Sequence, residues 1–304
     1  MKTAWCKALG AITLALASAT AGAQGFPARA IVLVVPFAAG GPTDTLGRIM
    51  AERMGRALGA TMVVENTVGA AGTIGVGRVA RATPDGYTLL VHHIGMSTAP
   101  ALYRKLPYDT LRDFVPIART AQQPLALVVN NNVPAKTLQE LIAFARQNAG
   151  KLNYGSAGNG GISHLVPEMF KQAVGIDMIH VPYKGTAPAF TDLIAGQVQF
   201  MAESVPQVSQ YAKVGKVRAL AVTSKERNNA LPDVPTMAEA GIANFEVVGF
   251  YGVLAPAGTP AAVVAKLSAA FGQTLESQEV RTRMTQQGAD AAYLGAEAFG
   301  AYLK

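Results

Sequence analysis

The sequence predicts an α/β protein built from two α/β domains that are joined by two crossover strands. Apolar runs rich in β-branched residues alternate with segments of helical periodicity along most of the 304 residues. Two of these runs, 124–130 and 245–254, stand between two complete sets of strands and helices, where connecting strands would lie. Two lobes joined by two strands make a hinge, so we expect a ligand to bind between them.

The first 23 residues have the pattern of a secretory signal peptide. Lys2 and Lys7 precede the apolar stretch 8–17, and the segment 21–23 (Ala-Gly-Ala) provides a small-residue cleavage site. The apolar stretch is much shorter than the roughly 20 residues needed to span a bilayer. We therefore expect cleavage before Gln24 and a secreted, soluble mature protein.

Cleavage would also remove Cys6, the single cysteine of the chain. Disulfide bonds and thiol catalysis are therefore excluded for the mature protein. The net charge of +7 comes without a long basic run or a basic stripe with interleaved aromatic residues, so we expect no nucleic-acid partner. The mild positive excess favours anionic ligands.

The first strand-to-helix junction, 31–44, reads IVLVVPFAAGGPTD. A buried-strand run breaks at Pro36 into a loop of small residues, and a helix over 43–58 follows. The unpaired N–H groups and the positive dipole end of that helix face the loop, and nothing bulky blocks an approaching anion. Asp44 has two open interpretations: an acid stabilised by the helix dipole, or a group that orients Thr43, loop N–H groups or a ligand amine.

The next elements continue the alternation of strand and helix. Strands are predicted at 61–66 and 86–93, and a later helix begins with the capping box of Thr137. His92 and His93 are neighbours on the second strand and therefore are expected to point to opposite faces. With no cysteine left and no other ligand spacing, we expect no metal site.

A second junction, 153–165, has the same arrangement as the first. It reads NYGSAGNGGISHL, a strand, a glycine-rich turn and the start of a helix. Two such junctions, more than 100 residues apart, would grip one small anionic ligand from two sides. Neither carries a phosphate-binding signature, since G-x-x-x-x-G-K-[ST] is absent and the spacing differs from G-x-G-x-x-G. A small carboxylate is therefore a simpler ligand to expect here than a nucleotide. We expect no cofactor.

Individual residues of this second junction have competing interpretations. His164 is either a ligand contact or a packed, hydrogen-bonded histidine. Ser156 lacks the nucleophile-elbow pattern and an identifiable acid–base partner. Met169 and Phe170 are expected to lie in the core.

The second half of the chain completes a second α/β set and then returns to the first domain. Strands are predicted at MIHVPY, VQFMAE and VRALAVTS, with a short helix closed by Gly196 between the first two. A helical region from 260 to about 287 follows the second crossover strand. We therefore place domain 1 at 24–123 and 249–304, and domain 2 at 124–248.

Six segments in this order resemble the extracytoplasmic substrate-binding proteins of tripartite tricarboxylate transporters, the Bug family. They are VPFAAGGPTD-x-x-x-R ending at Arg48, PDGYTLL (84–90), NYGSAGNGGISHL (153–165), HVPYKGTAPAFTDLIAGQV (180–198), LPDVPTMAEAG (231–241) and LAPAGTP (254–260). The resemblance implies a two-lobed periplasmic-binding-protein fold of the type II-like class, in the periplasm. It further implies a monomer that closes over a small carboxylate and delivers it to a membrane permease.

The resemblance and the two junctions together give a set of expected substrate-binding residues. Those of the first lobe are Phe37, Ala38, Gly41, Thr43, Asp44, Ser97 and Thr98. Those of the second lobe are Ser156, Gly158, Asn159, Ser163, His164, Tyr183, Lys184 and Glu203. Lys184 is either a positive charge at the cleft or a solvated turn residue.

The sequence departs from the family pattern at three places. Phe250 stands where Trp is frequent, and the chain ends somewhat short of the usual C-terminal helix. Glu203 stands where Asp is common, and the longer carboxylate would favour an amine or a hydroxyl on the ligand.

The main prediction is a receptor without chemistry, for a mono- or dicarboxylic or amino acid. One rival is a secreted hydrolase or isomerase that uses Asp44, His164 and Ser156 in the same cleft. It is disfavoured because no base stands in an identifiable pair with a nucleophile. Another rival is a ligand sensor that feeds a signalling partner in place of a permease.

Overall fold

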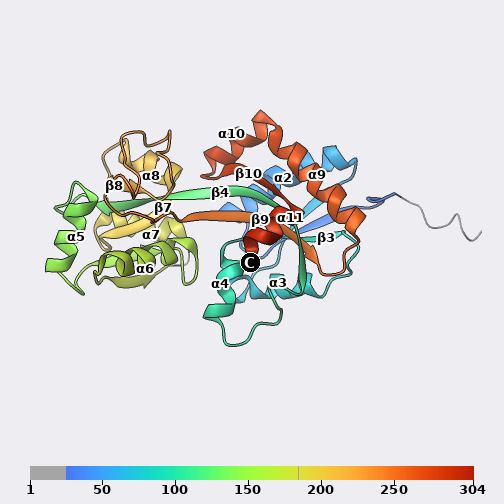
Figure 1. Ribbon diagram of the computed structural model, residues 1–304, viewed down its shortest axis with the longest axis horizontal. Helices are drawn as coiled ribbons and strands as arrows, with labels where there is room; N and C mark the ends of the chain where they lie inside the picture. Colours follow the sequence, from blue (N-terminus) through green and yellow to red (C-terminus); the bar gives the residue numbers. More distant parts are fainter. Residues whose placement is uncertain (1–24, 184) are drawn as a thin grey trace, which may run out of the picture.

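The computed structural model describes residues 25–183 and 185–304. The predicted signal peptide, 1–23, and Lys184 lie outside the described residues. The described chain forms two lobes, and two long strands, β4 and β9, run between them (Figure 1). Within this part of the chain, we find no helix whose length and apolar character would let it cross a membrane.

The first lobe contains a mixed sheet in the order β2-β1-β3-β9-β4, with β10 paired to β4. Its strands are β1 (Ile31–Val35), β2 (Met62–Asn66), β3 (Thr88–His93), β4 (Phe114–Asn130), β9 (Val248–Pro256) and β10 (Asp290–Gly295). β1 pairs in parallel with β2 and β3, whereas β9 is antiparallel to both β3 and β4. The parallel arrangement of β2, β1 and β3 therefore ends where β9 enters the sheet.

Helices cover both faces of this sheet, as continuous apolar strands require. They are α2 (Pro42–Leu58), the short 3₁₀ helix η1 (Ala70–Gly72), α3 (Thr73–Ala80), α4 (Gly95–Leu102), α9 (Ala261–Glu276), α10 (Gln278–Gln286) and α11 (Ala296–Leu303). Met50 of α2 and Phe271 of α9 lie in the core on one face. Val76 of α3 and Phe299 of α11 lie in the core on the other.

The second lobe continues the sheet in the order β4-β7-β5-β6, with β8 also paired to β4. Its strands are β5 (Asn153–Ser156), β6 (Ile179–Pro182), β7 (Phe200–Ser204) and β8 (Val217–Val222), and its helices are α5 (Leu138–Gln147), α6 (Ile162–Val174), α7 (Thr186–Ala195) and α8 (Val205–Ala212). α5 and α6 pack on one face of the sheet, and α7 and α8 on the other. The predicted elements of this half of the chain occur in the predicted order, and α8, which was not predicted, lies between β7 and β8.

β4 is longer than the sequence predicts, because it begins at Phe114 rather than near residue 124. Its first part pairs with β9 in the first lobe, and its second part pairs with β7 and β8 in the second. The register shifts near Pro116, which has no N–H to donate, and polar residues follow it, so the apolar pattern of a strand is hidden. The domain limits at 123/124 and 248/249 stay a prediction; the first falls inside β4 and the second between the first two residues of β9.

One core prediction on α6 is wrong. Phe170 is fully buried, but Met169 is 45% exposed. The buried positions of α6 are Ser163, Val166, Pro167, Phe170 and Val174. Met169 falls outside this stripe.

Candidate functional site

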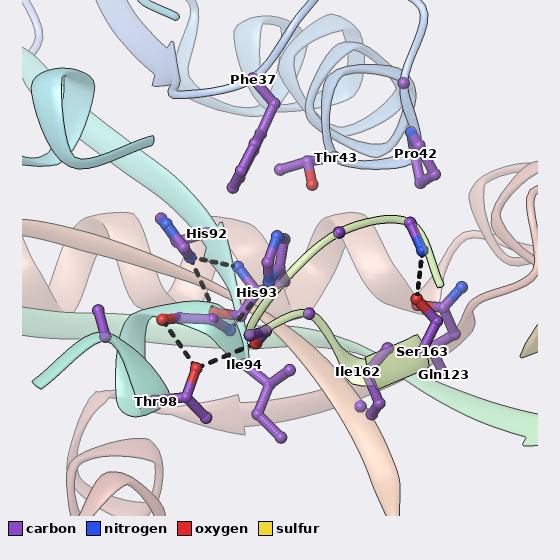
Figure 2. A pocket seen from close by; sticks show the side chains of 18 of the residues that line it. Phe37, Pro42, Thr43, His92, His93, Ile94, Thr98, Gln123, Ile162 and Ser163 are labelled. Atoms are coloured by element: carbon purple, nitrogen blue, oxygen red, sulfur yellow. Dashed lines mark hydrogen bonds between the residues drawn. The ribbon is translucent and has the colours of Figure 1, made fainter. Parts of the chain in front are cut away.

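A cavity of about 560 Å³ lies between the lobes and is lined by residues of both. The first lobe contributes the loop before α2, the end of β3 and one side of α4. The second lobe contributes the loop before α6, the start of α7 and the end of β7. β9 adds Phe250 and Tyr251 from the crossover. Figure 2 shows side chains of both lobes around this space.

The two glycine-rich loops have the same backbone conformation at their Gly-Gly pairs. Gly40 and Gly160 have φ of 80° and 77°, in the left-handed region that favours glycine. Gly41 and Gly161, which cap α2 and α6, have φ/ψ of −74°/167° and −75°/165°. The sequences GGPTD and GGISH thus occupy equivalent places in the two lobes.

A side chain four residues further along fixes each loop. The Gly40 N–H donates to Asp44 Oδ2 at 2.8 Å, and the Gly160 N–H donates to His164 Nδ1 at 3.1 Å. The equivalence of the two loops therefore extends to their internal hydrogen bond, although one acceptor is a carboxylate and the other an imidazole.

Asp44 is held as a charged group by its surroundings. Arg48 Nε and Asn66 Nδ2 each donate to its carboxylate at 2.9 Å. Burial opposes the charge, but the hydrogen bonds from Arg48, Gly40 and Asn66 outweigh it and lower the pKa of Asp44. Asp44 does not line the cavity, so in this structure it orients the loop and not a ligand amine.

The second loop uses three of its own N–H groups internally. Besides Gly160, the Gly158 N–H donates to Ser156 Oγ at 3.1 Å and the Ala157 N–H donates to Ser163 Oγ at 3.0 Å. The N–H groups of Gly161, Ile162 and Ser163 at the start of α6 donate to no acceptor of the described residues. Those three donors, more than the loop itself, are available to an anion.

Ser156 has a histidine partner that the sequence did not reveal. Its Oγ lies 2.7 Å from His180 Nε2, and the His180 ring stacks between Tyr154 and His164 at centroid distances of 4.8 and 4.2 Å. Burial lowers the pKa of His180 to about 4, so the ring is neutral at neutral pH. Ser156 is fully buried and does not line the cavity.

The structure places about half of the expected site residues at the cavity wall. Those that line it are Phe37, Gly41, Thr43, Thr98, Gly158, Asn159, Ser163 and Glu203. Those that do not line it are Ala38, Asp44, Ser97, Ser156, His164 and Tyr183. Lys184 lies outside the described residues.

The reasons for these placements are local. Ala38 and Ser97 are exposed, and the Tyr183 hydroxyl donates to Asp192 Oδ2 at 2.6 Å. Thr98 Oγ1, by contrast, lies 3.2 Å from the carbonyl oxygens of both Gly95 and Gly160 and shares its hydrogen between them, so α4 of the first lobe touches the loop of the second (Figure 2).

The expectation that His92 and His93 point to opposite faces is wrong. β3 ends at His93, the chain turns into α4, and both rings line the cavity. Their centroids lie 4.9 Å apart, and each ring packs against Phe37, at 5.2 and 4.7 Å. Burial lowers the pKa of His92 to about 4, so this wall is aromatic and uncharged at neutral pH. The described residues contain no group of three His, Cys, Asp or Glu side chains suited to a metal ion.

The crossover strands supply cavity residues that sequence reasoning missed. Gln123 of β4 and Tyr251 of β9 line the wall, and the Tyr251 hydroxyl donates to Gln123 Oε1 at 3.0 Å. Recognition of residues 114–123 as a strand paired with β9 would have found both. No lysine or arginine is among the described lining residues, and Glu203 is their one acidic side chain.

A family profile described as "Tripartite tricarboxylate transporter family receptor" matches residues 46–302. The chain belongs to this family. The resemblance stated from the sequence motifs is therefore confirmed. Members of the tripartite tricarboxylate transporter receptor family are solute-binding proteins rather than enzymes.

Solved structures of similar proteins confirm the two-lobed periplasmic-binding-protein fold. The periplasmic binding protein BugD is 43% identical, with a TM-score of 0.80 over 91% of this chain and 94% of that one. MatC from Rhodopseudomonas palustris, solved with bound malate, is 38% identical, with a TM-score of 0.80 over 91% and 96%. The R. palustris protein Rpa4515, solved with adipate, is 34% identical, with a TM-score of 0.83 over 92% and 94%.

Proposed function

We propose that this receptor captures a small carboxylate in the cavity between its lobes, in the periplasm, and delivers it to a membrane permease without changing it. The observation that carries the proposal is the pair of equivalent Gly-Gly loops, each of which directs the start of a helix at the same cavity. The solved relatives that hold malate and adipate support a carboxylate as the ligand.

The physical basis is anion binding by backbone groups. α2 and α6 have 17 and 13 residues, long enough for a helix dipole with its positive end at the N-terminus. Free N–H groups such as those of Ile162 and Ser163 then bind a carboxylate without a side-chain cation. The absence of Lys and Arg from the described wall is what this mode of binding predicts.

The Ser156–His180 pair is the observation that favours a hydrolase, and its surroundings argue against one. A nucleophile has to reach the substrate, but Ser156 is fully buried and its Oγ accepts the Gly158 N–H. The pair thus shapes the loop that leads into α6.

A panel of carboxylic acids measured by thermal denaturation tests the proposal. At 100 times its Kd, a ligand adds about 2.7 kcal/mol to the free energy of unfolding, which raises the melting temperature. Methyl esters of the same acid are expected to give no shift. Equal stabilisation by the ester would contradict carboxylate recognition, and a change in the ligand's mass after hours of incubation would support the hydrolase.

Delivery to a permease and sensing are separated by transport measurements in cells. Deletion of the gene is expected to abolish uptake of the radiolabelled acid, and the mature protein in the periplasmic fraction is expected to begin at Gln24. Normal uptake with loss of an acid-induced transcriptional response would instead identify a sensor.

A further inference from the structure

We propose that Glu203 makes this receptor select carboxylates that carry an ammonium group, so that amino acids bind in preference to hydroxy acids and unsubstituted acids. The inference rests on the proposed function and names the ligand class of the same cavity. It is carried by one buried carboxylate oxygen that has no partner.

Glu203 stands at the hinge side of the cavity. It lies near the end of β7 and pairs with Ala126 of β4, just past the point where β4 enters the second lobe. The side chain lines the cavity and is only 6% exposed. Its position is therefore fixed by the sheet and not by a mobile loop.

The two carboxylate oxygens of Glu203 differ in their surroundings. Oε1 accepts the Ser204 N–H at 2.7 Å. Oε2 is buried and accepts no hydrogen bond from the described residues. The terminal torsion of a glutamate is soft, so this oxygen can turn toward a group inside the cavity. A buried polar atom without a partner costs free energy, and a ligand donor removes that cost.

No cation of the described cavity wall balances the charge of Glu203. The charge of Glu203 acts on Tyr251, whose pKa is raised by burial and by that charge, and whose hydroxyl hydrogen already goes to Gln123. Burial likewise raises the pKa of Glu203, although the Ser204 N–H and the nearby Thr186 hydroxyl oppose the shift. The described residues thus leave the negative charge of Glu203 without a balancing positive charge.

The total charge in the cavity decides which ligand group is the best hydrogen-bond donor to Glu203. A carboxylate held at the helix ends adds a second negative charge to the cavity, so an unsubstituted acid needs a proton on Glu203. A hydroxyl donates a hydrogen bond but leaves both charges in place. An ammonium donates to Oε2 and neutralises one charge, which makes a charge-assisted hydrogen bond.

Matched sets of acids measured by titration calorimetry at pH 7 test the proposal. Each set keeps one carbon skeleton and changes the substituent at C2: alanine, lactate and propionate; aspartate, malate and succinate; glutamate, 2-hydroxyglutarate and glutarate; phenylalanine, phenyllactate and phenylpropionate. In the set that binds best, the amino acid is expected to bind about 10- to 100-fold more tightly than the unsubstituted acid, with the hydroxy acid between.

Glu203→Gln keeps the size of the side chain and removes its charge. It is expected to fold with an unchanged or higher melting temperature and to reduce the preference for the amino acid to less than about threefold. Glu276→Gln, at an exposed position at the end of α9, is the matched control and is expected to keep the preference. An ammonium preference that survives in Glu203→Gln would overturn the proposal.

Titration of the unaltered protein in two buffers of different ionisation enthalpy gives a second measurement that needs no variant. Because burial raises the pKa of Glu203 and an ammonium partner favours its charged form, amino-acid binding is expected to release a proton or to leave the proton count unchanged, whereas uptake of about one proton would overturn the proposal. So would tighter binding of the unsubstituted acid in the best set. If no acid of any set binds, the carboxylate-receptor function itself fails; if acids bind without regard to the C2 substituent, only the role of Glu203 fails.

Discussion

Single side chains keep both glycine loops in shape. Asp44 and His164 occupy equivalent positions and accept equivalent N–H groups, but Asp44 is an anion paired with Arg48 and His164 is an imidazole. A negative charge close to a helix start opposes an incoming carboxylate, and a neutral ring does not. The second lobe therefore offers the more favourable field to an anion.

This equivalence gives a variant series at His164. His164→Asn is expected to keep the bond to Gly160, because the equally short Asp44 makes that bond in the first lobe. His164→Ala removes it and is expected to weaken carboxylate binding about 3- to 10-fold, the cost of one neutral hydrogen bond. His164→Asp is expected to bind more weakly than His164→Asn because it adds a charge. Calorimetry measures all three, and equal affinities of the Ala and Asn variants would contradict the role of the bond.

The buried histidines predict how stability depends on pH. Burial lowers the pKa of His92 and of His180 from 6.5 to about 4. Between these values the unfolded chain binds protons that the folded protein excludes, so stability falls as the pH drops from about 6.5 towards 4.

For His92, which is 4% exposed, the loss is on the order of 3 kcal/mol. Urea unfolding at pH 7, 6, 5 and 4.5 measures it, and His92→Phe is expected to flatten the slope. The lowered pKa of Asp44 acts mainly below about pH 5, in the parent and in His92→Phe alike, so the comparison of the two slopes isolates His92. An unchanged slope in the variant would show that His92 is not held neutral.

Two helices present their starts to the cavity, and the residue that caps each start is a glycine with ordinary φ. A Cβ at Gly161 would have its nearest neighbour at 3.7 Å, the Gly158 carbonyl oxygen, which is normal contact. At Gly158 φ is 130°, so any side chain there strains the loop regardless of ligand. Gly161 is therefore the position at which backbone access is tested without unfolding the loop.

Gly161→Val is expected to fold normally and to lose at least tenfold in carboxylate affinity, because the side chain covers the free N–H groups at the start of α6. Lys184→Ala is expected to lose less than Gly161→Val. Circular dichroism and melting accompany the titration. A folded Gly161→Val that binds normally, beside a Lys184→Ala that does not bind, would show that a side-chain cation and not the backbone holds the anion.

The lobes are linked by β4 and β9 at one side of the cavity and touch across it where Thr98 donates to the Gly160 carbonyl. Leu102 of the same helix packs on Gly160, where a Cβ would stand 2.2 Å from its Cδ1. Closure of this kind is favoured when a ligand contacts both lobes, because only the closed form makes both sets of contacts.

Small-angle scattering is expected to give a smaller radius of gyration with ligand than without. Thr98→Ala is expected to increase the radius of the ligand-free protein, because it removes the contact across the cavity. The ligand-bound radii of variant and parent are expected to agree. Identical radii in all four samples would indicate a rigid cavity and would contradict the hinge.

Sequence reasoning found both loops because their signals are local. A broken strand, bare glycines and a helix start lie within 14 residues at 31–44 and within 13 at 153–165. It did not find the pair of Gln123 and Tyr251, which lies on two strands joined only in the sheet. It misplaced His92 and His93 because the alternation of a strand ends where the chain turns into α4.

The sequence by itself determined the family, the two-lobed α/β fold and the two helix starts that face the cavity. Each of these is indicated by short segments of consecutive residues. Only the tertiary structure decided which side chains reach the cavity. Asp44 and His164 turn inward to hold their own loops, Ser156 is buried against His180, and Glu203 keeps an oxygen without a partner. The physical reason is that hydrogen-bond partners and burial come from segments far apart in sequence. The local pattern of residues therefore does not predict them.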